Sequence, residues 1–397
     1  MNGTDRRLQA ALEAGAARSG EYGEGHRELW AALSAAVDGG KRFRPALVLA
    51  AHDALGGRAP GPAERVGAAL EMLHTAFVVH DDVIDGDVVR RGRPNVSGTF
   101  RAEARRRGAG EEAARGYGDA AGILAGDLAL VTATRMIARC GAPEDVLDAL
   151  LDLLEDAVHA SAAGELADVG LSLPLDGRST GVADAVRVAE LKTAVYSFRL
   201  PLQAGALLAG APEEAVAALG PVGRDLGIGF QLLDDLLGVF GDPSRTGKSA
   251  LSDLRDGKPT ALLAHARGTG AWEHLGALVG DPALDDGGAE RARALLTGCG
   301  ARERVAALAD EYLDGALRAA GRAPVAPPLG EALAGVVEQI RRTAAAALLP
   351  AEASPPAAAP PPAPGERAGA RPGGPARRSA AAVGPAVARP GTLAVPR

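Results

Sequence analysis

Apolar residues recur along most of this chain at the spacing of an amphipathic helix. Two stretches show it well, "ERVGAALEMLHTAFVVHDD" from residue 64 and "DVLDALLDLLEDAVHASAAGELADV" from residue 145, where Leu, Val and Ala return every three or four positions. Alternating runs of β-branched residues, which are typical of half-buried strands, are hard to find anywhere. The pattern therefore predicts an all-α protein.

Gly, Pro and Asp collect between these helical stretches and predict the loops, as in "ALGGRAPGPAE", "RRGRPNVSG" and "LVGDPALDDGGAE". After Leu349 the composition changes abruptly to a mixture of Pro, Ala, Gly and Arg. Such a segment cannot bury enough apolar surface to offset the entropy of ordering it. We therefore expect one helical domain over residues 1–349 and a disordered, mildly basic tail over residues 350–397.

The composition narrows the class of protein further. The 397 residues are 47% hydrophobic and 23% charged with a net charge of -7, which is typical of a soluble chain with a large core and argues against nucleic acid as a partner. No window holds the roughly 18 consecutive apolar residues of a membrane span, and the N-terminus lacks the apolar core of a signal peptide. We expect a cytoplasmic protein whose two cysteines, Cys140 and Cys299, are reduced and buried.

Three aspartates end the apolar run "EMLHTAFVV": Asp81, Asp82 and Asp85. On a helix, Asp85 is three and four residues from the other two, so the three carboxylates should share one face within a turn and repel one another. Hard oxygen ligands that leave coordination positions open suit Mg²⁺. A solvated acidic helix end would give the same letters, but the apolar residues before it indicate burial. The sequence predicts a magnesium site here.

A second apolar run, "DLGIGFQLL", also ends in paired aspartates, Asp234 and Asp235, and a Gly-rich basic loop follows it. Two acidic clusters that face one cavity could hold several Mg²⁺ ions around a diphosphate. Arginine forks and lysine charges suit phosphate oxygens, although each of them taken singly also fits an ordinary surface charge. The candidate phosphate-binding residues are Lys41, Arg42, Arg44, Arg90, Arg91, Lys192, Lys248 and Lys258.

The ordered set of motifs "GGKRFRP", "EMLHTAFVVHDDVIDGDVVRRGRP", "LKT", "GFQLLDD" and "SDLRDGKPT" resembles the trans-isoprenyl diphosphate synthases, a family of prenyltransferases. The resemblance covers nearly all of residues 30–345 and leaves out the tail. A single DDxxD motif would be weak evidence for this family, but several of its motifs in the same order are specific evidence. The resemblance implies a single helical bundle around a central cavity and a homodimer.

The resemblance also implies an activity. It is the Mg²⁺-dependent head-to-tail condensation of isopentenyl diphosphate with an allylic diphosphate (dimethylallyl, geranyl or farnesyl), which yields a terpenoid precursor with three Mg²⁺ ions in the site. Metal binding would fall to Asp81, Asp82, Asp85, Asp234 and Asp235, and these aspartates with Lys192 would be the catalytic residues. Isopentenyl diphosphate would contact Lys41, Arg44, His74 and Arg91. The allylic diphosphate would contact Arg90, Lys192, Thr193, Gln231, Lys248 and Lys258.

The chain departs from the family pattern at two positions. Glu165, near Asp168, stands where the family more often has Gln, and Gly238 stands where the second motif usually has a third Asp. Asp242 lies about two helical turns beyond Asp234 and is too distant to replace directly the carboxylate that is missing at Gly238. Two other functions therefore stay open, a non-catalytic regulatory subunit of another prenyltransferase and a terpene cyclase, although a cyclase would have no use for "GGKRFRP".

Residues one turn before Asp81 are expected to form the floor of the tunnel that holds the growing chain. These are Ala76 and Phe77. In the family that this chain resembles, enzymes with bulky aromatic residues at both positions make the short C15 product, and enzymes with small residues there make longer products. One large and one small residue predict the C20 product geranylgeranyl diphosphate, with C15 farnesyl diphosphate as the alternative.

Overall fold

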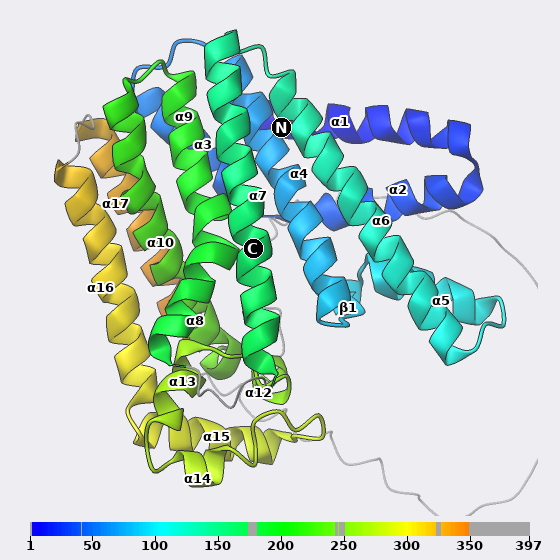
Figure 1. The fold of residues 1–397 in the computed structure, drawn as a ribbon, viewed down its shortest axis with the longest axis vertical. Helices are drawn as coiled ribbons and strands as arrows, with labels where there is room; N and C mark the ends of the chain where they lie inside the picture. Colours follow the sequence, from blue (N-terminus) through cyan, green and yellow to red (C-terminus); the bar gives the residue numbers. More distant parts are fainter. Residues whose placement is uncertain are drawn as a thin grey trace, which may run out of the picture. The chain divides into compact units, whose positions relative to one another are not determined.

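The computed structural model of the protein describes residues 2–40, 42–173, 181–242, 245, 251–322 and 327–348. Its first half contains the helices α1 (Gly3–Ser19), α2 (Glu24–Val37), α3 (Phe43–Ala54), α4 (Pro60–Ile84), α5 (Val96–Arg106), α6 (Glu111–Ala138) and α7 (Glu144–Ser172), with the short 3₁₀ turn η1 (Gly20–Tyr22) between α1 and α2. The prediction of an all-α protein is confirmed (Figure 1).

The second half continues with α8 (Val182–Val188), the π-helix η2 (Ala189–Arg199), α9 (Leu200–Leu208), α10 (Glu213–Phe240), α12 (Ser252–Arg255), α13 (Ala261–Arg267), α14 (Trp272–Leu275), α15 (Asp286–Gly298), α16 (Ala301–Arg322) and α17 (Pro327–Leu348). Residues 1–351 group into one compact unit. The tail expected over residues 350–397 lies outside the described residues, so its disorder and the boundary at residue 349 stay predictions.

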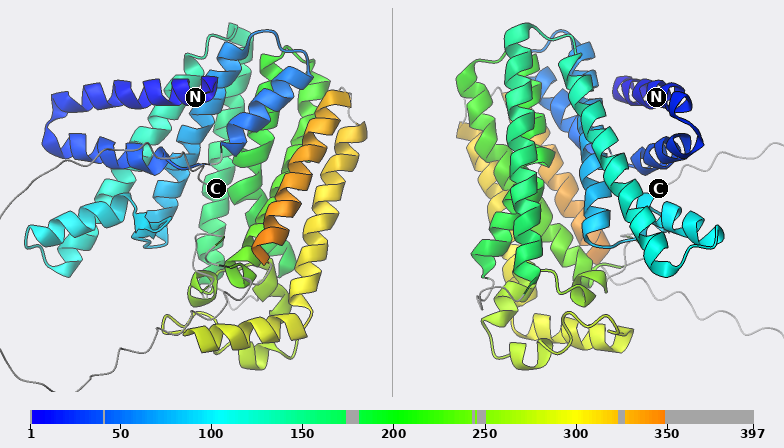
Figure 2. Two further views of the ribbon diagram at one scale, coloured as in Figure 1. Left: turned by 180° about the vertical axis from the view of Figure 1, so that it is seen from behind. Right: turned by 45° about the vertical axis from the view of Figure 1, so that its right-hand side comes forward.

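Long helices pack side by side to form the bundle. α4 lies along α6, α3 along α9, and α10 along both η2 and α16. The hairpin of α1 and α2 lies beside α4 and α6, whereas α16 and α17 line the opposite side of the bundle (Figure 2). Fully buried side chains such as Leu73 on α4, Leu226 on α10 and Leu313 on α16 fill the spaces between these helices. The apolar residues that recur at helical spacing in the sequence thus form the core between the packed helices.

A tight hairpin follows α4 and joins the only strands in the described part of the chain, β1 (Val89–Arg90) and β2 (Arg93–Pro94). The two central residues of its turn, Arg91 and Gly92, have φ values of 53° and 73°. Positive φ at both positions is the geometry that lets two antiparallel strands reverse over two residues. Arg90, the residue just before this turn, lies close to the end of α4 and donates to Asp82.

The π-helix η2 is the irregular element of the bundle, and it carries the "LKT" motif. Wide π turns are rare in proteins and occur frequently at functional sites. Its close approach to α7 depends on Gly164, because a Cβ at that position would lie 2.4 Å from the backbone nitrogen of Lys192. A glycine on α7 therefore lets the motif residue Lys192 approach the residues that follow Gly164.

Among the helices described, α6 alone is long and apolar enough to cross a membrane, judged by length and composition. A core helix of a globular protein passes the same test, and small buried residues of α6 such as Ala125 and Ala129 pack in the core. Both cysteines are unpaired as expected, but only Cys140 is buried, since Cys299 lies partly exposed near the end of α15.

Candidate active site

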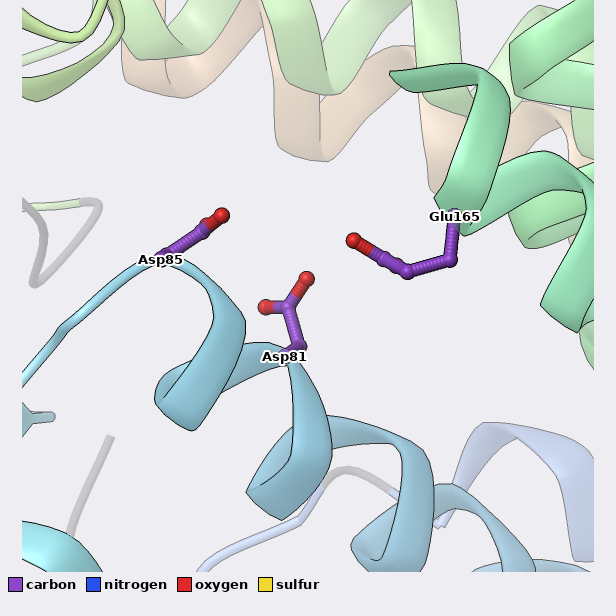
Figure 3. A group of neighbouring side chains, drawn as sticks. All are labelled: Asp81, Asp85 and Glu165. Atoms are coloured by element: carbon purple, nitrogen blue, oxygen red, sulfur yellow. The ribbon is translucent and has the colours of Figure 1, made fainter. Parts of the chain in front are cut away.

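Three carboxylates from two helices meet at the end of α4. One oxygen atom from each of Asp81, Asp85 and Glu165 lies within 4.8 Å of the others (Figure 3). Asp81 and Asp85 occupy the C-terminal turn of α4, where the helix dipole disfavours negative charge. These groups therefore need nearby cations. The sequence analysis had assigned Asp81 and Asp85 to a metal site, and the structure adds Glu165 from α7.

Asp82 lies apart from this group. Its side chain is only 4% exposed, and it accepts a hydrogen bond of 2.7 Å from Nε of Arg90. Burial raises the pKa of Asp82 to about 6 despite the opposing charge of Arg90. The expectation that all three aspartates share one face is therefore met only by Asp81 and Asp85, because consecutive residues project about 100° apart around a helix. Asp82 is placed to hold Arg90.

Lys192 is surrounded by carboxylates. Its Nζ lies 2.7 Å from Asp168 Oδ2, 3.0 Å from both oxygens of Glu165 and 3.1 Å from Asp81 Oδ1. Burial opposes the charge of Lys192, but these carboxylates outweigh it and raise the lysine pKa. The pKa of Asp81 is lowered in turn, because Lys192, Lys258 and Arg90 outweigh the effect of its burial. The expected site lysine is thus held beside the first acidic cluster.

The second acidic cluster lies on α10, on the same cavity. Gln231 connects it to η2, since its amide donates to Asp235 Oδ1 at 2.8 Å and Thr193 Oγ1 donates to its carbonyl oxygen at 2.8 Å. Burial raises the pKa of Asp235 to about 8, with further contributions from the charges of Asp253 and Asp234, although the bond from Gln231 acts against it. Four residues that the sequence analysis had selected, Thr193, Gln231, Asp234 and Asp235, therefore lie together.

Lys258 contacts the first acidic cluster from a distant part of the chain. It follows α12 and lines the cavity beside α10, and its Nζ lies 3.1 Å from Asp85 Oδ2 at the end of α4. The charges of Asp85, Asp253 and Asp81 raise its pKa against the effect of burial. Two further lysines predicted for the site, Lys41 and Lys248, lie outside the described residues.

A separate cationic group lies between α3, α4 and η2. Arg44 donates to Ser197 Oγ at 2.8 Å and to the Tyr196 hydroxyl at 3.3 Å, and His74 Nδ1 lies 3.2 Å from that same hydroxyl. Burial and the charges of Arg44, Arg91 and Arg90 lower the pKa of His74 well below its ordinary value. Two of the residues expected to bind isopentenyl diphosphate, Arg44 and His74, thus meet at Tyr196, and the charge of the third, Arg91, acts on His74.

Two residues beside this second cationic group escaped the sequence analysis. The hydroxyl of Tyr196 lies between Arg44 and His74. The sequence signal for Tyr196 was its position four residues after Lys192, which places both on the same helical face. Glu71 is buried beneath the arginines, with an oxygen 3.1 Å from Arg42 NH1 and another 3.8 Å from Arg44 NH1. The signal for Glu71 was a single acid inside the apolar run "AALEMLH".

The charged groups line a cavity of about 720 Å³ together with apolar side chains such as those of Phe77, Leu130 and Val158. Phe77 lines it and packs edge-on against Tyr196, with ring centroids 4.9 Å apart. Ala76 is fully buried in the core and is not among the lining residues. Of the two residues expected at the tunnel floor, the structure thus places Phe77 at the cavity and Ala76 behind it, because adjacent residues of α4 face different sides.

The described lining of the cavity has an excess of negative charge. It contains five carboxylates, those of Asp81, Glu165, Asp168, Asp234 and Asp235, against the two lysines Lys192 and Lys258. Carboxylate oxygens are the ligands that Mg²⁺ prefers, and they commonly hold it together with phosphate groups. The donor set therefore fits divalent cations bound with a diphosphate.

This chain is similar in sequence to known proteins. Residues 26–284 match the polyprenyl synthetase family. The chain is 33% identical over 290 residues to the geranylfarnesyl diphosphate synthase of Aeropyrum pernix, which covers 72% of this chain and 84% of that protein. It is 35% identical over 241 residues to the (2E,6E)-farnesyl diphosphate synthase of Mycobacterium bovis, which covers 59% of this chain and 60% of that protein.

A solved structure extends the comparison to three dimensions. The crystal structure of the geranylgeranyl pyrophosphate synthase from Corynebacterium glutamicum, complexed with isoprenyl diphosphate and magnesium, superimposes with a TM-score of 0.76 at 30% identity and covers 87% of this chain and 97% of that chain. The family match spans more than half of the sequence and contains both acidic clusters. The protein belongs to the polyprenyl synthetase family of prenyltransferases.

Proposed function

We propose that this protein condenses isopentenyl diphosphate with an allylic diphosphate in a Mg²⁺-dependent reaction and forms geranylgeranyl diphosphate. The observation that carries the proposal is a cavity lined by carboxylates, lysines and apolar side chains, with a second cationic group that contacts its lining residue Tyr196. Each feature matches one part of the reaction: a leaving diphosphate, a hydrocarbon chain and a second diphosphate.

The allylic diphosphate binds at the acidic end of the cavity. Asp81, Asp85, Asp234 and Asp235 would hold Mg²⁺ there, and the bound metal would supply positive charge against the charge that develops on the leaving diphosphate. Lys192 and Lys258 add fixed positive charges within the same site. The carbon–oxygen bond then breaks, leaving the diphosphate and an allylic carbocation. Apolar walls protect this cation from water.

Isopentenyl diphosphate binds at the second cationic group. Arg44 and Arg91 provide charge-assisted hydrogen bonds to its phosphates, and neutral His74 adds a polar contact. This places the double bond of isopentenyl diphosphate beside the allylic cation, where its electron pair forms the new carbon–carbon bond. The resulting cation loses a proton to the departed diphosphate. No side chain acts as a nucleophile.

Product length rests on the cavity floor. The similar proteins named above make C15, C20 and C25 products by their names, so similarity alone leaves the length open. Phe77 narrows the cavity beside Tyr196, whereas the small residues Ala162 and Ala185 line other parts of it. An intermediate depth favours the C20 product, and farnesyl diphosphate (C15) is the alternative.

The decisive experiment supplies the purified protein with Mg²⁺, isopentenyl diphosphate and each of dimethylallyl, geranyl and farnesyl diphosphate, and identifies the products by mass. We expect C20 to dominate with all three primers. A dominant C15 product would correct the length. No condensation with any primer would favour the regulatory subunit, and a cyclic hydrocarbon formed without isopentenyl diphosphate would favour the cyclase.

We also propose that the protein is a homodimer that pairs through α6. Tyr117, Leu124 and Val131 are 43%, 55% and 66% exposed and lie seven residues apart, so they form one apolar stripe along the helix. Exposed apolar surface of this kind is typical of protein interfaces. Light scattering should give twice the chain mass for the parent and a lower mass for Leu124→Glu. The expected cytoplasmic location stays a prediction.

A further inference from the structure

Gly238 and Asp253 compete for one position on α10. A Cβ atom built on Gly238 would lie 1.9 Å from Asp253 Oδ2 and 2.8 Å from its carboxyl carbon. Non-bonded atoms do not approach so closely, so any side chain at residue 238 would displace this carboxylate. The carboxylate of Asp253 therefore stands where a side chain at position 238 would begin.

That position belongs to the second acidic cluster. Residue 238 is four residues after Asp234 and three after Asp235, so it lies on the same face of α10, one turn further along. The negative charge of Asp253 also acts on two groups that line the cavity, since it raises the pKa of both Asp235 and Lys258. Asp253 is thus part of the electrostatic environment of the active site.

The short helix α12 fixes Asp253 in this place. Leu254 is 1% exposed and packs into the core beneath α10. Arg255 donates two hydrogen bonds to the carbonyl oxygen of Leu284, at 2.9 and 2.6 Å, and the backbone nitrogen of Lys258 donates to the carbonyl oxygen of Asp253. The backbone that carries this carboxylate therefore belongs to a packed segment rather than to a loose loop.

We propose that Asp253 supplies the third carboxylate of the second acidic cluster from α12, and that Gly238 is the residue that makes room for it. The ligand is a Mg²⁺–diphosphate complex, so the inference rests on the proposed function and deepens it. It explains how the chain retains a site with only two aspartates on α10. The third negative charge comes from a residue 15 positions further along the chain.

The test measures metal binding directly. The melting temperature of each variant is followed as Mg²⁺ is added at a fixed concentration of inorganic pyrophosphate, and the half-maximal Mg²⁺ concentration is read from the curve. Asp253→Asn keeps the shape and removes the charge. Gly238→Ala keeps the charge and displaces the carboxylate. Each should raise the half-maximal Mg²⁺ concentration about tenfold, the scale of losses seen when groups around a bound metal are removed.

The matched control is Glu213→Gln at the opposite end of α10. It also removes one negative charge, but 25 residues of helix, or about 38 Å, separate it from residue 238. Its half-maximal Mg²⁺ concentration should equal that of the parent. The melting temperature without Mg²⁺ and pyrophosphate shows that each variant is folded.

A second arm uses Gly238→Asp, which displaces one carboxylate and supplies another. Its half-maximal Mg²⁺ concentration should stay near that of the parent, and adding Asp253→Asn to it should have little effect, because the two residues share one role. An unchanged value for Asp253→Asn alone would overturn the inference, as would a tenfold decrease for Gly238→Asp. Product formation by the parent is scored separately, so a failure of the proposed function can be told from a failure of this inference.

Discussion

Lys258 Nζ lies 3.1 Å from Asp85 Oδ2, although 173 residues separate the two along the chain. The bond joins the end of α4 to the segment that follows α12. It therefore links the first acidic cluster to that segment. A bound diphosphate would compete with Asp85 for this lysine.

Removing this lysine should weaken catalysis more than folding. Lys258→Ala loses a charge-assisted contact worth about 1.5 to 3 kcal/mol, so we expect kcat/KM for the allylic substrate to fall by about 10- to 150-fold. Lys258→Arg keeps the charge and should lose less. Steady-state kinetics with varied allylic diphosphate provide the measurement, and equal losses for the two variants would argue against a role for the charge.

Neighbouring aspartates should behave differently when replaced. Asp81→Ala removes a metal ligand from the cavity and should reduce kcat by orders of magnitude at a nearly unchanged melting temperature. Asp82→Ala leaves the half-buried Arg90 without its closest partner, so it should also lower stability, by about 1 to 3 kcal/mol. Thermal unfolding of both variants beside their kinetics separates the two roles. Equal melting temperatures would contradict the division.

The raised pKa of Asp235 predicts how Mg²⁺ binding depends on pH. The carboxyl holds its proton up to about pH 8, and Mg²⁺ must displace that proton. The half-maximal Mg²⁺ concentration should therefore fall as the pH rises from 6 to 8 and then level off. In Asp235→Asn this dependence should be weaker, which titrations at several pH values can check.

The same shift has a consequence for stability without Mg²⁺. Because the folded pKa lies above the unfolded value, this group stabilises the fold fully below about pH 4, and that contribution is lost as the pH rises through about 8. The difference in melting temperature between the parent and Asp235→Asn should change over this range. A constant difference would show that Asp235 titrates normally.

Arg91 should act on one substrate only. Its side chain donates to the carbonyl oxygen of Asp38 near the second cationic group and is exposed, so Arg91→Ala should fold normally. We expect the KM for isopentenyl diphosphate to rise by about 10- to 150-fold, since a charge-assisted contact of about 1.5 to 3 kcal/mol is lost. The KM for the allylic primer should change little. Equal effects on both substrates would contradict two separate sites.

Product length should respond to Phe77 and stability to Ala76. Phe77→Ala opens the cavity beside Tyr196 and should lengthen the main product by one or more five-carbon units. Ala76→Phe forces a ring into a fully buried position and should cost about 1 to 3 kcal/mol of stability. Product masses and thermal unfolding measure the two effects. An unchanged product from Phe77→Ala would place the floor elsewhere.

Local patterns in the sequence were enough to predict the all-α fold and the metal site. The spacing of apolar residues is a property of each helix by itself, so the all-α fold could be predicted without knowing which helices touch. The paired aspartates after apolar runs indicated a metal site for the same reason. Their repulsion at helical spacing is local, and a nearby cation relieves it wherever the helix lies.

The tertiary structure decided which of these charges meet. Asp82 and Asp81 are adjacent letters, yet one is buried against Arg90 and the other faces the cavity, because the packing of α4 selects its exposed side. Ala76 and Phe77 divide in the same way. Contacts between distant elements, such as Glu165 with Lys192, Tyr196 with His74 and Asp253 at Gly238, have no local signature. They arise because long-range packing fixes the distance between side chains that the sequence keeps far apart.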